Sequence, residues 1–102
     1  AMQYQANIII VVINNGIYAT IRMHQEREYP HRVIGTDMIN PDFVALAGAY
    51  GAHGELVVGT EDFEAAFKRS QAAGRPALIE VRLDPDILTP TATVTSLRAA
   101  KK

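Results

Sequence analysis

An uninterrupted apolar run from Ile8 to Ile13 stops abruptly at two asparagines and a glycine, Asn14-Asn15-Gly16. The run is rich in β-branched residues and apolar at every position, which is typical of a central strand in a parallel sheet covered on both faces by helices. In such sheets, ligands bind beyond the carboxyl ends of the strands. The two amides therefore lie where they could bind a cation or a ligand, although a strand cap followed by an Asn-Gly turn explains the same residues.

The composition indicates an ordinary globular protein. The chain has 102 residues, 48% of them hydrophobic and 21% charged, and its formal net charge is -1. That charge gives no reason to expect nucleic acid or a membrane surface as partner. The absence of cysteine excludes disulfides and thiolate zinc sites. The apolar run is too short to span a bilayer and has no basic segment before it, so a cytoplasmic location is expected.

The remaining pattern alternates strands with helices. The predicted strands are residues 7–13, 55–58 and 76–83, and the predicted helices are 17–27, 41–50 and 61–73. Asn40 is expected to cap the second helix, with Pro41 at its first position, and Thr60 is expected to open the third. Together these elements predict an α/β fold containing part of a doubly wound parallel sheet.

Several tracts, taken in order, resemble a known family. Residues 14–22, preceded by the apolar strand, resemble the end of the thiamine-diphosphate motif, which runs Gly-Asp-Gly, some two dozen residues, then Asn-Asn. The likeness continues through residues 40–47, 50–52 and 76–81 and covers about residues 6–88. It is closest to the acetolactate synthase and benzoylformate decarboxylase group of thiamine enzymes.

The resemblance implies a fragment of the thiamine-diphosphate-binding fold. Residues 1–88 would be the C-terminal part of the diphosphate-binding domain, and residues 89–102 a mobile tail. No Gly-Asp-Gly occurs in the sequence, so the chain is expected to belong to a longer enzyme. By resemblance that enzyme is a lyase or transferase that decarboxylates or ligates 2-oxo acids. The isolated chain is expected to be inactive and to contribute no catalytic residue.

The same resemblance assigns the cofactor-binding residues. The side-chain oxygen of Asn15 and the backbone carbonyl of Ile17 would bind Mg²⁺, Asn14 would orient the loop, and Gly16 and Tyr18 would approach the diphosphate. Asn14 could equally stabilise a turn, and Tyr18 could equally be a packing aromatic. Since both metal ligands are neutral, neither Mg²⁺ nor thiamine diphosphate is expected to bind this chain alone.

Two residues on the first predicted helix would border the substrate pocket in related enzymes. Ile21 and His24 lie one turn apart on one face. The family commonly has a bulky apolar or aromatic residue at the second position, so His24 is a departure; a surface histidine is the alternative. The arginines and glutamates of residues 22–32 are expected to form a solvated charged face.

The expected partners follow from what the chain lacks. They are the remaining portion of the enzyme, or a partner subunit, with the pyrimidine-binding domain, and a small 2-oxo acid as substrate; a homo-oligomer is expected. The alternative from a different class is a free-standing α/β module. Such a module would self-associate through the apolar strand or complete a split thiamine enzyme as a small subunit.

Overall fold

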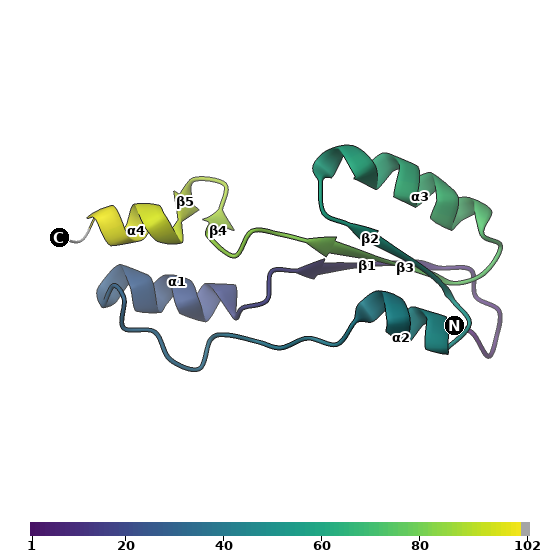
Figure 1. Ribbon diagram of the computed structural model, residues 1–102, viewed down its shortest axis with the longest axis horizontal. Helices are drawn as coiled ribbons and strands as arrows, with labels where there is room; N and C mark the ends of the chain where they lie inside the picture. The colour runs from purple at the N-terminus through teal and green to yellow at the C-terminus, as the bar shows by residue number, and fades with distance from the viewer. Residues whose placement is uncertain (101–102) are drawn as a thin grey trace. The chain divides into compact units, whose positions relative to one another are not determined.

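The computed structural model describes residues 1–100, which divide into two units (Figure 1). Residues 1–14 and 40–82 form the first, here called the sheet unit. Residues 15–39 and 83–100 form the second, here called the helix-pair unit. None of the helices in residues 1–100 is long and apolar enough to cross a membrane.

The sheet unit is built on three parallel strands. In chain order its elements are β1 (Ile9–Asn14), α2 (Phe43–Ala49), β2 (His53–Val57), the 3₁₀ turn η1 (Thr60–Asp62), α3 (Phe63–Ala72) and β3 (Ala77–Arg82). The strand order is β1-β3-β2, and β3 pairs in parallel with both neighbours. The predicted α/β fold with a parallel sheet is confirmed.

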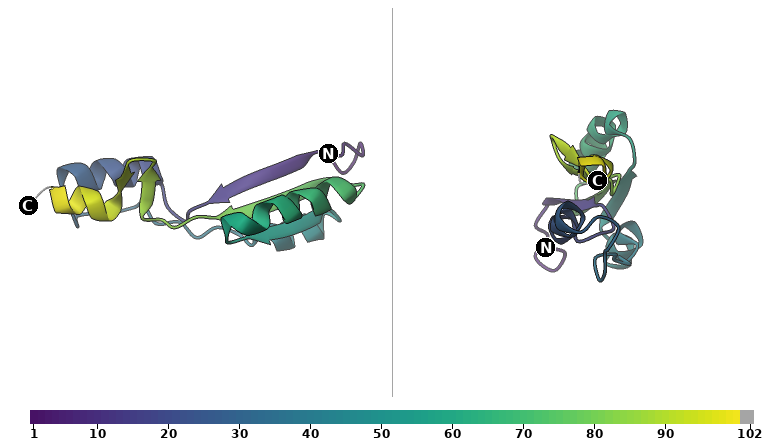
Figure 2. Two further views of the ribbon diagram at one scale, coloured as in Figure 1. Left: turned by 90° about the horizontal axis from the view of Figure 1, so that it is seen from above. Right: turned by 90° about the vertical axis from the view of Figure 1, so that its left-hand side faces the viewer.

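Apolar burial holds this unit together. Val57, Ala66 and Ile79 form its buried centre, and Phe63 and Phe67 of α3 pack against them. The two helices lie over β2 and β3 and on opposite sides of the sheet (Figures 1 and 2). Because strand side chains alternate between faces, Ile79 points toward α3, and its neighbours in β3 point toward α2.

The strand β1 lies at an edge of the sheet, so its predicted central position is wrong for the described chain. Only β3 pairs with it within residues 1–100. Helices α2 and α3 lie over the other two strands, and Ile10, Val11 and Ile13 are therefore 44%, 40% and 58% exposed. The apolar run shows that these residues are suited to burial. Burial itself needs neighbouring elements that this part of the chain does not supply.

Two predicted helix starts are also corrected. Asp42, not Asn40, caps α2, because its Oδ1 accepts a hydrogen bond from the backbone N–H of Ala45 at 3.0 Å. Asn40 instead donates to Asn14. Thr60 opens the short 3₁₀ turn η1, and the α-helix begins at Phe63.

The helix-pair unit contains α1 (Ala19–Glu28), the antiparallel pair β4 (Ile87–Thr89) and β5 (Ala92–Thr93), and α4 (Val94–Ala100). Helix α1 agrees closely with the predicted helix at 17–27. Residues 89–102 were expected to form a mobile tail, and within them α4 packs on α1. The predicted boundary at residue 88 and the mobility of residues 89–102 stay predictions, and residues 101–102 lie outside the described part.

Candidate functional site

The segment Asn14 to Tyr18 crosses from one unit to the other, so each part is described within its own unit. Asn14 is the last residue of β1 in the sheet unit. Its Nδ2 donates to Oε2 of Glu80 at 3.0 Å, and its Oδ1 accepts from Nδ2 of Asn40 at 2.8 Å. The side chain of Asn14 is thus directed into the sheet unit, and its role in orienting the loop stays a prediction.

Glu80, which was not singled out from the sequence, contacts the candidate site residue Asn14. It is 1% exposed on the central strand β3, where its Oε2 accepts from Asn14 and from Nε of Arg82. Within residues 1–100, its Oε1 is buried and has no hydrogen-bond partner. The available signal was a glutamate in the otherwise apolar run Ala77–Val81, since an unpaired charge is costly in such a position.

Asn15 and Gly16 form a tight turn at the start of the helix-pair unit. The Oδ1 of Asn15 accepts from the backbone N–H of Ile17 at 3.3 Å. Gly16 has φ of +71°, a conformation that glycine adopts without the steric cost of a Cβ. A Cβ added at Gly16 would meet no atom within 4 Å, so the backbone conformation, and not crowding, requires glycine there.

Ile17 and Tyr18 lead from this turn into α1. Ile17 is 8% exposed and forms an isolated antiparallel bridge with Asp37. The two hydrogen bonds of the bridge are Tyr18 N–H to Thr36 O and Met38 N–H to Gly16 O, at 2.8 and 2.9 Å, so neither uses the carbonyl of Ile17. Tyr18 is 53% exposed and is the N-cap residue of α1, which favours an external role over the alternative of a packing aromatic.

Helix α1 begins at Ala19, two residues later than the predicted start at residue 17. No side chain caps it, and the first-turn N–H groups of a helix have no acceptor within the helix itself. The residues predicted to border a substrate pocket, Ile21 and His24, are both exposed and lie one turn apart on α1. Their place beside a substrate pocket stays a prediction.

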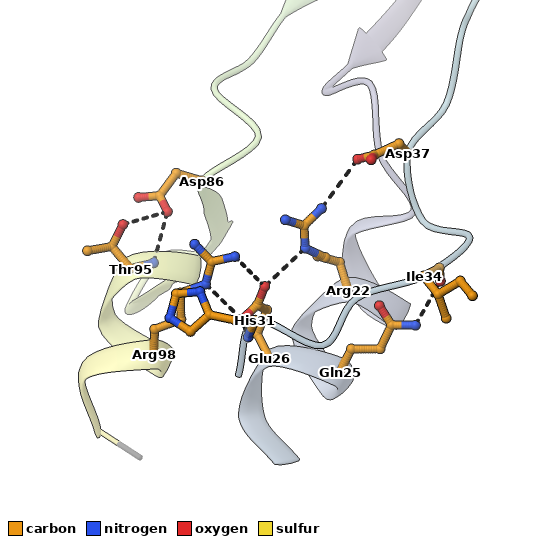
Figure 3. Close-up of polar contacts among 9 residues, drawn as sticks. All are labelled: Arg22, Gln25, Glu26, His31, Ile34, Asp37, Asp86, Thr95 and Arg98. Carbon is orange, nitrogen blue, oxygen red and sulfur yellow. Dashed lines mark hydrogen bonds and ion pairs between the residues drawn. The ribbon is translucent and has the colours of Figure 1, made fainter. Parts of the chain in front are cut away.

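A charge cluster in the helix-pair unit was predicted to be solvated, and for Glu26 that prediction is wrong (Figure 3). Glu26 is 0% exposed, and Arg98 donates to both of its oxygens at 2.8 and 2.7 Å. Nε of Arg22 and the backbone N–H of His31 also donate, at 3.3 and 3.1 Å. The hydrogen bonds from Arg98 outweigh burial and lower the pKa of Glu26 from 4.5 to about 2.

Both arginines also line, with Ile17, a polar cavity of 310 Å³. The aspartates at positions 37, 84 and 86 line the same cavity. Its walls therefore carry charges of both signs and do not by themselves select an anion. Among residues 1–100, no three His, Asp or Glu side chains are placed to hold a metal ion.

These features can be compared with those of known families. Residues 1–81 match the model of a family described as thiamine pyrophosphate enzyme, C-terminal TPP binding domain. The chain belongs to this family. The match includes the strand β1, the turn from Asn14 to Tyr18 and the buried Glu80, and it confirms the family predicted from the sequence.

The curated relatives of this thiamine pyrophosphate enzyme domain are several times longer. The catalytic subunit of mitochondrial acetolactate synthase from Saccharomyces cerevisiae is 32% identical over 85% of this chain and 13% of its own length. Benzoylformate decarboxylase from Pseudomonas aeruginosa is 33% identical over 79% of this chain and 15% of its own length. The acetolactate synthase large subunit from Cyanidium caldarium is 34% identical over 76% of this chain and 14% of its own length.

Proposed function

We propose that this chain is the C-terminal portion of a thiamine-diphosphate-dependent enzyme acting on 2-oxo acids, with lyase or transferase chemistry. The observation that carries the proposal is the Asn14-Asn15-Gly16 turn at the carboxyl end of a parallel strand, inside the matched residues 1–81. The small share of each relative that the chain covers, 13% and 15% in two cases, supports its belonging to a larger enzyme.

The donors in the turn fit a magnesium ion in part. The side-chain oxygen of Asn15 and the carbonyl of Ile17 are hard oxygen ligands of the kind Mg²⁺ prefers. An amide oxygen has two lone pairs, so the contact from Ile17 N–H leaves Asn15 able to bind a cation. Both donors are neutral, and a carboxylate and phosphate oxygens must complete the site. We therefore propose that Mg²⁺ and the cofactor bind the intact enzyme and not this chain alone.

The start of α1 fits the diphosphate. Gly16 allows the backbone to turn with positive φ, and the first-turn N–H groups and the helix dipole of α1 favour an anion. The exposed side chain of Tyr18 stands at the same helix end. In this proposal, Gly16 and Tyr18 with the first-turn amides contact the diphosphate, while Asn15 and Ile17 hold the metal.

The residues of this chain position the cofactor and take no part in proton transfer. When bound, thiamine diphosphate supplies the carbon nucleophile and electron sink for breaking or forming the bond beside a 2-oxo group. Ile21 and His24 would lie beside the small 2-oxo acid. The partner is the portion or subunit carrying the pyrimidine-binding domain, in a homo-oligomer, and a cytoplasmic location stays a prediction from composition.

The coding sequence upstream of Ala1 gives the first test. We expect an in-frame Gly-Asp-Gly some two dozen codons before Asn14. The protein encoded by the whole reading frame should then bind thiamine diphosphate in the presence of Mg²⁺, as measured by calorimetry. The variant Asn15→Ala should weaken that binding by at least about tenfold, or 1.4 kcal/mol. Asn7→Ala, an exposed asparagine before the same strand, is the matched control, and equal binding by both variants would contradict the proposal.

The exposed strand β1 favours a second candidate, a module that self-associates or completes a split thiamine enzyme as a small subunit. Ile8, just before the strand, and Ile10, Val11 and Ile13 within it are 40% to 58% exposed. An unpaired apolar edge is a template for another strand. Light scattering on the 102-residue chain tests self-association. A strictly monomeric mass at high concentration would argue against it, and a co-purifying protein containing Gly-Asp-Gly would support the split enzyme.

A further inference from the structure

Glu80 is a buried carboxylate in a strand whose neighbouring positions are apolar. It is 1% exposed, between Ile79 and Val81 of β3. One oxygen accepts from Asn14 and Arg82, each at 3.0 Å, while the other has no partner within residues 1–100. Burying an incompletely paired carboxylate costs several kcal/mol, and an apolar side chain would fill the same space without that cost. The glutamate therefore calls for a reason other than packing.

The reason lies in the side chain that Glu80 contacts. A carboxylate can only accept hydrogen bonds, so the NH₂ group of Asn14 must face Glu80. The opposite end of the amide, Oδ1, then faces the donor Nδ2 of Asn40 at 2.8 Å. These two contacts fix both the direction and the rotation of the Asn14 amide at the end of β1.

We propose that Glu80 is a positioning residue for the cofactor turn: it holds the amide of Asn14 in the sheet unit, so that Asn15, the next residue, presents the metal-binding oxygen. This inference rests on the proposed function. The amide of Asn15 takes no part in the hydrogen bonds between Glu80, Asn14 and Asn40, and its Oδ1 contacts only the N–H of Ile17 among the hydrogen bonds described. Glu80 thus gives two identical adjacent side chains different roles: Asn14 is held in the sheet unit, and Asn15 presents the metal-binding oxygen.

The charge of Glu80 makes its hydrogen bond with Asn14 stronger than a bond to a neutral acceptor would be. A hydrogen bond to an ionised acceptor is roughly twice as strong as one between neutral groups. Glutamine at position 80 would keep the size and one oxygen acceptor but lose the charge. Leucine would remove the acceptor altogether and leave the NH₂ group of Asn14 facing an apolar side chain.

The first readout uses the 102-residue chain without metal or cofactor. The side-chain NH₂ protons of Asn14 are followed by NMR in the wild type, Glu80→Gln and Glu80→Leu. We expect the signal of the proton that faces Glu80 to move upfield in the glutamine variant and further in the leucine variant, as the acceptor weakens and is lost. Glu64→Gln is the matched control, because Glu64 has an 81% exposed side chain on α3, and it should leave Asn14 unchanged. Methyl signals of Val57 and Ile79 report whether each variant keeps its fold.

The second readout is the affinity of the whole reading frame for thiamine diphosphate with Mg²⁺. Residues that orient a metal ligand typically contribute 10–100-fold to metal affinity, so Glu80→Gln should weaken binding by about tenfold and Glu64→Gln should not. If Glu80→Gln folds but leaves the Asn14 signals or the affinity unchanged, the inference is overturned even though Asn15→Ala still weakens binding. If Asn15→Ala does not change the affinity for thiamine diphosphate, the proposed function is contradicted. The positioning role of Glu80, which depends on that function, is then contradicted too.

Discussion

Different forces stabilise the two units of this chain, each within itself. The sheet unit has a buried apolar centre of Val57, Ala66 and Ile79. Its ion pair between Glu55 and Arg69 is partly exposed, and its buried carboxylate, Glu80, has one oxygen without a hydrogen-bond partner within residues 1–100. In the helix-pair unit the most deeply buried side chain is a carboxylate, Glu26, held by arginines. One unit is therefore stabilised mainly by removing apolar surface from water, and the other depends heavily on one satisfied buried charge.

This difference predicts that the two units respond to different perturbations. Apolar burial changes little with pH, whereas a buried carboxylate with a lowered pKa stabilises the fold only while it is ionised. Hydrogen exchange can follow the two units separately, because amides in β3 report on the sheet unit and amides in α4 on the helix-pair unit. The predictions below use this separation, from the largest expected effect to the smallest.

The substitution Ile79→Ala should have the largest effect and should act on the sheet unit. Ile79 is 0% exposed at the centre of the apolar cluster, and truncating such a side chain costs about 4 kcal/mol through lost burial and the cavity left behind. Urea unfolding, monitored through the hydrogen exchange of β3 amides, measures the loss in the free energy of unfolding. Ile39→Ala, at a fully exposed isoleucine, should cost less than about 0.5 kcal/mol. Equal losses for the two variants would mean that the apolar cluster is not the stabilising centre.

The substitution Glu26→Gln should destabilise the helix-pair unit by about 2–3 kcal/mol. It replaces the charged acceptor of two hydrogen bonds from Arg98 and leaves partly buried donors poorly paired. Amides of α4 should exchange faster, and amides of β3 should change much less. Glu64→Gln, which weakens only the exposed pair with Lys68, is the control and should have little effect. If β3 amides accelerate as much as those of α4, the two units unfold together and the comparison fails.

Acid should weaken the helix-pair unit through the same carboxylate. The pKa of Glu26 is about 2 in the folded chain, below its ordinary value of 4.5, so the unfolded state takes up the proton first as pH falls. The stabilisation from Glu26 is thus fully present above about pH 5 and is lost as pH falls from 4.5 toward 2.

The variant Glu26→Gln isolates this effect from other carboxylates. Arg69 and His53 also lower the pKa of Glu55 in the sheet unit, so acid weakens that unit as well. The difference in α4 exchange between wild type and Glu26→Gln should be large at pH 6 and small near pH 2. A difference that stays constant across this range would show that Glu26 contributes through shape and not through charge.

The same contrast explains how much of the molecule could be predicted from the sequence. Strands β1, β2 and β3 and helices α2 and α3 follow from local hydrophobic patterns, and the position of the Asn14-Asn15-Gly16 turn follows from the end of such a pattern. The pairs that define the site do not. Asn14 and Glu80 are 66 residues apart, and Glu26 and Arg98 are 72 apart. No local pattern specifies which of several arginines meets which glutamate, since that choice depends on how the elements pack.

Edge position and capping were missed for a related reason. The residues of β1 are all suited to burial, but burial depends on a neighbouring strand and not on the strand's own sequence. Asn40 has the residue type of a helix cap, yet its amide serves Asn14, and Asp42 caps α2 in its place. Side-chain amides can form hydrogen bonds with several kinds of partner. A residue type that suits a helix cap is therefore not enough to predict that the residue caps the helix.

The smallest predicted effect compares one chemical change in the two units. Gly16→Ala places a Cβ on a residue with φ of +71°, whereas Gly48→Ala places it inside α2, and in neither case does the Cβ meet an atom within 4 Å. The strained backbone should make Gly16→Ala destabilising by about 1 kcal/mol, and the better helix propensity of alanine should make Gly48→Ala stabilising by up to about 1 kcal/mol. Urea unfolding measures both. Opposite signs would establish that the turn after Asn15 is held at positive φ in solution. A neutral Gly16→Ala would mean that the turn relaxes to negative φ, and the carbonyl of Ile17, the proposed metal ligand, would then have no fixed orientation.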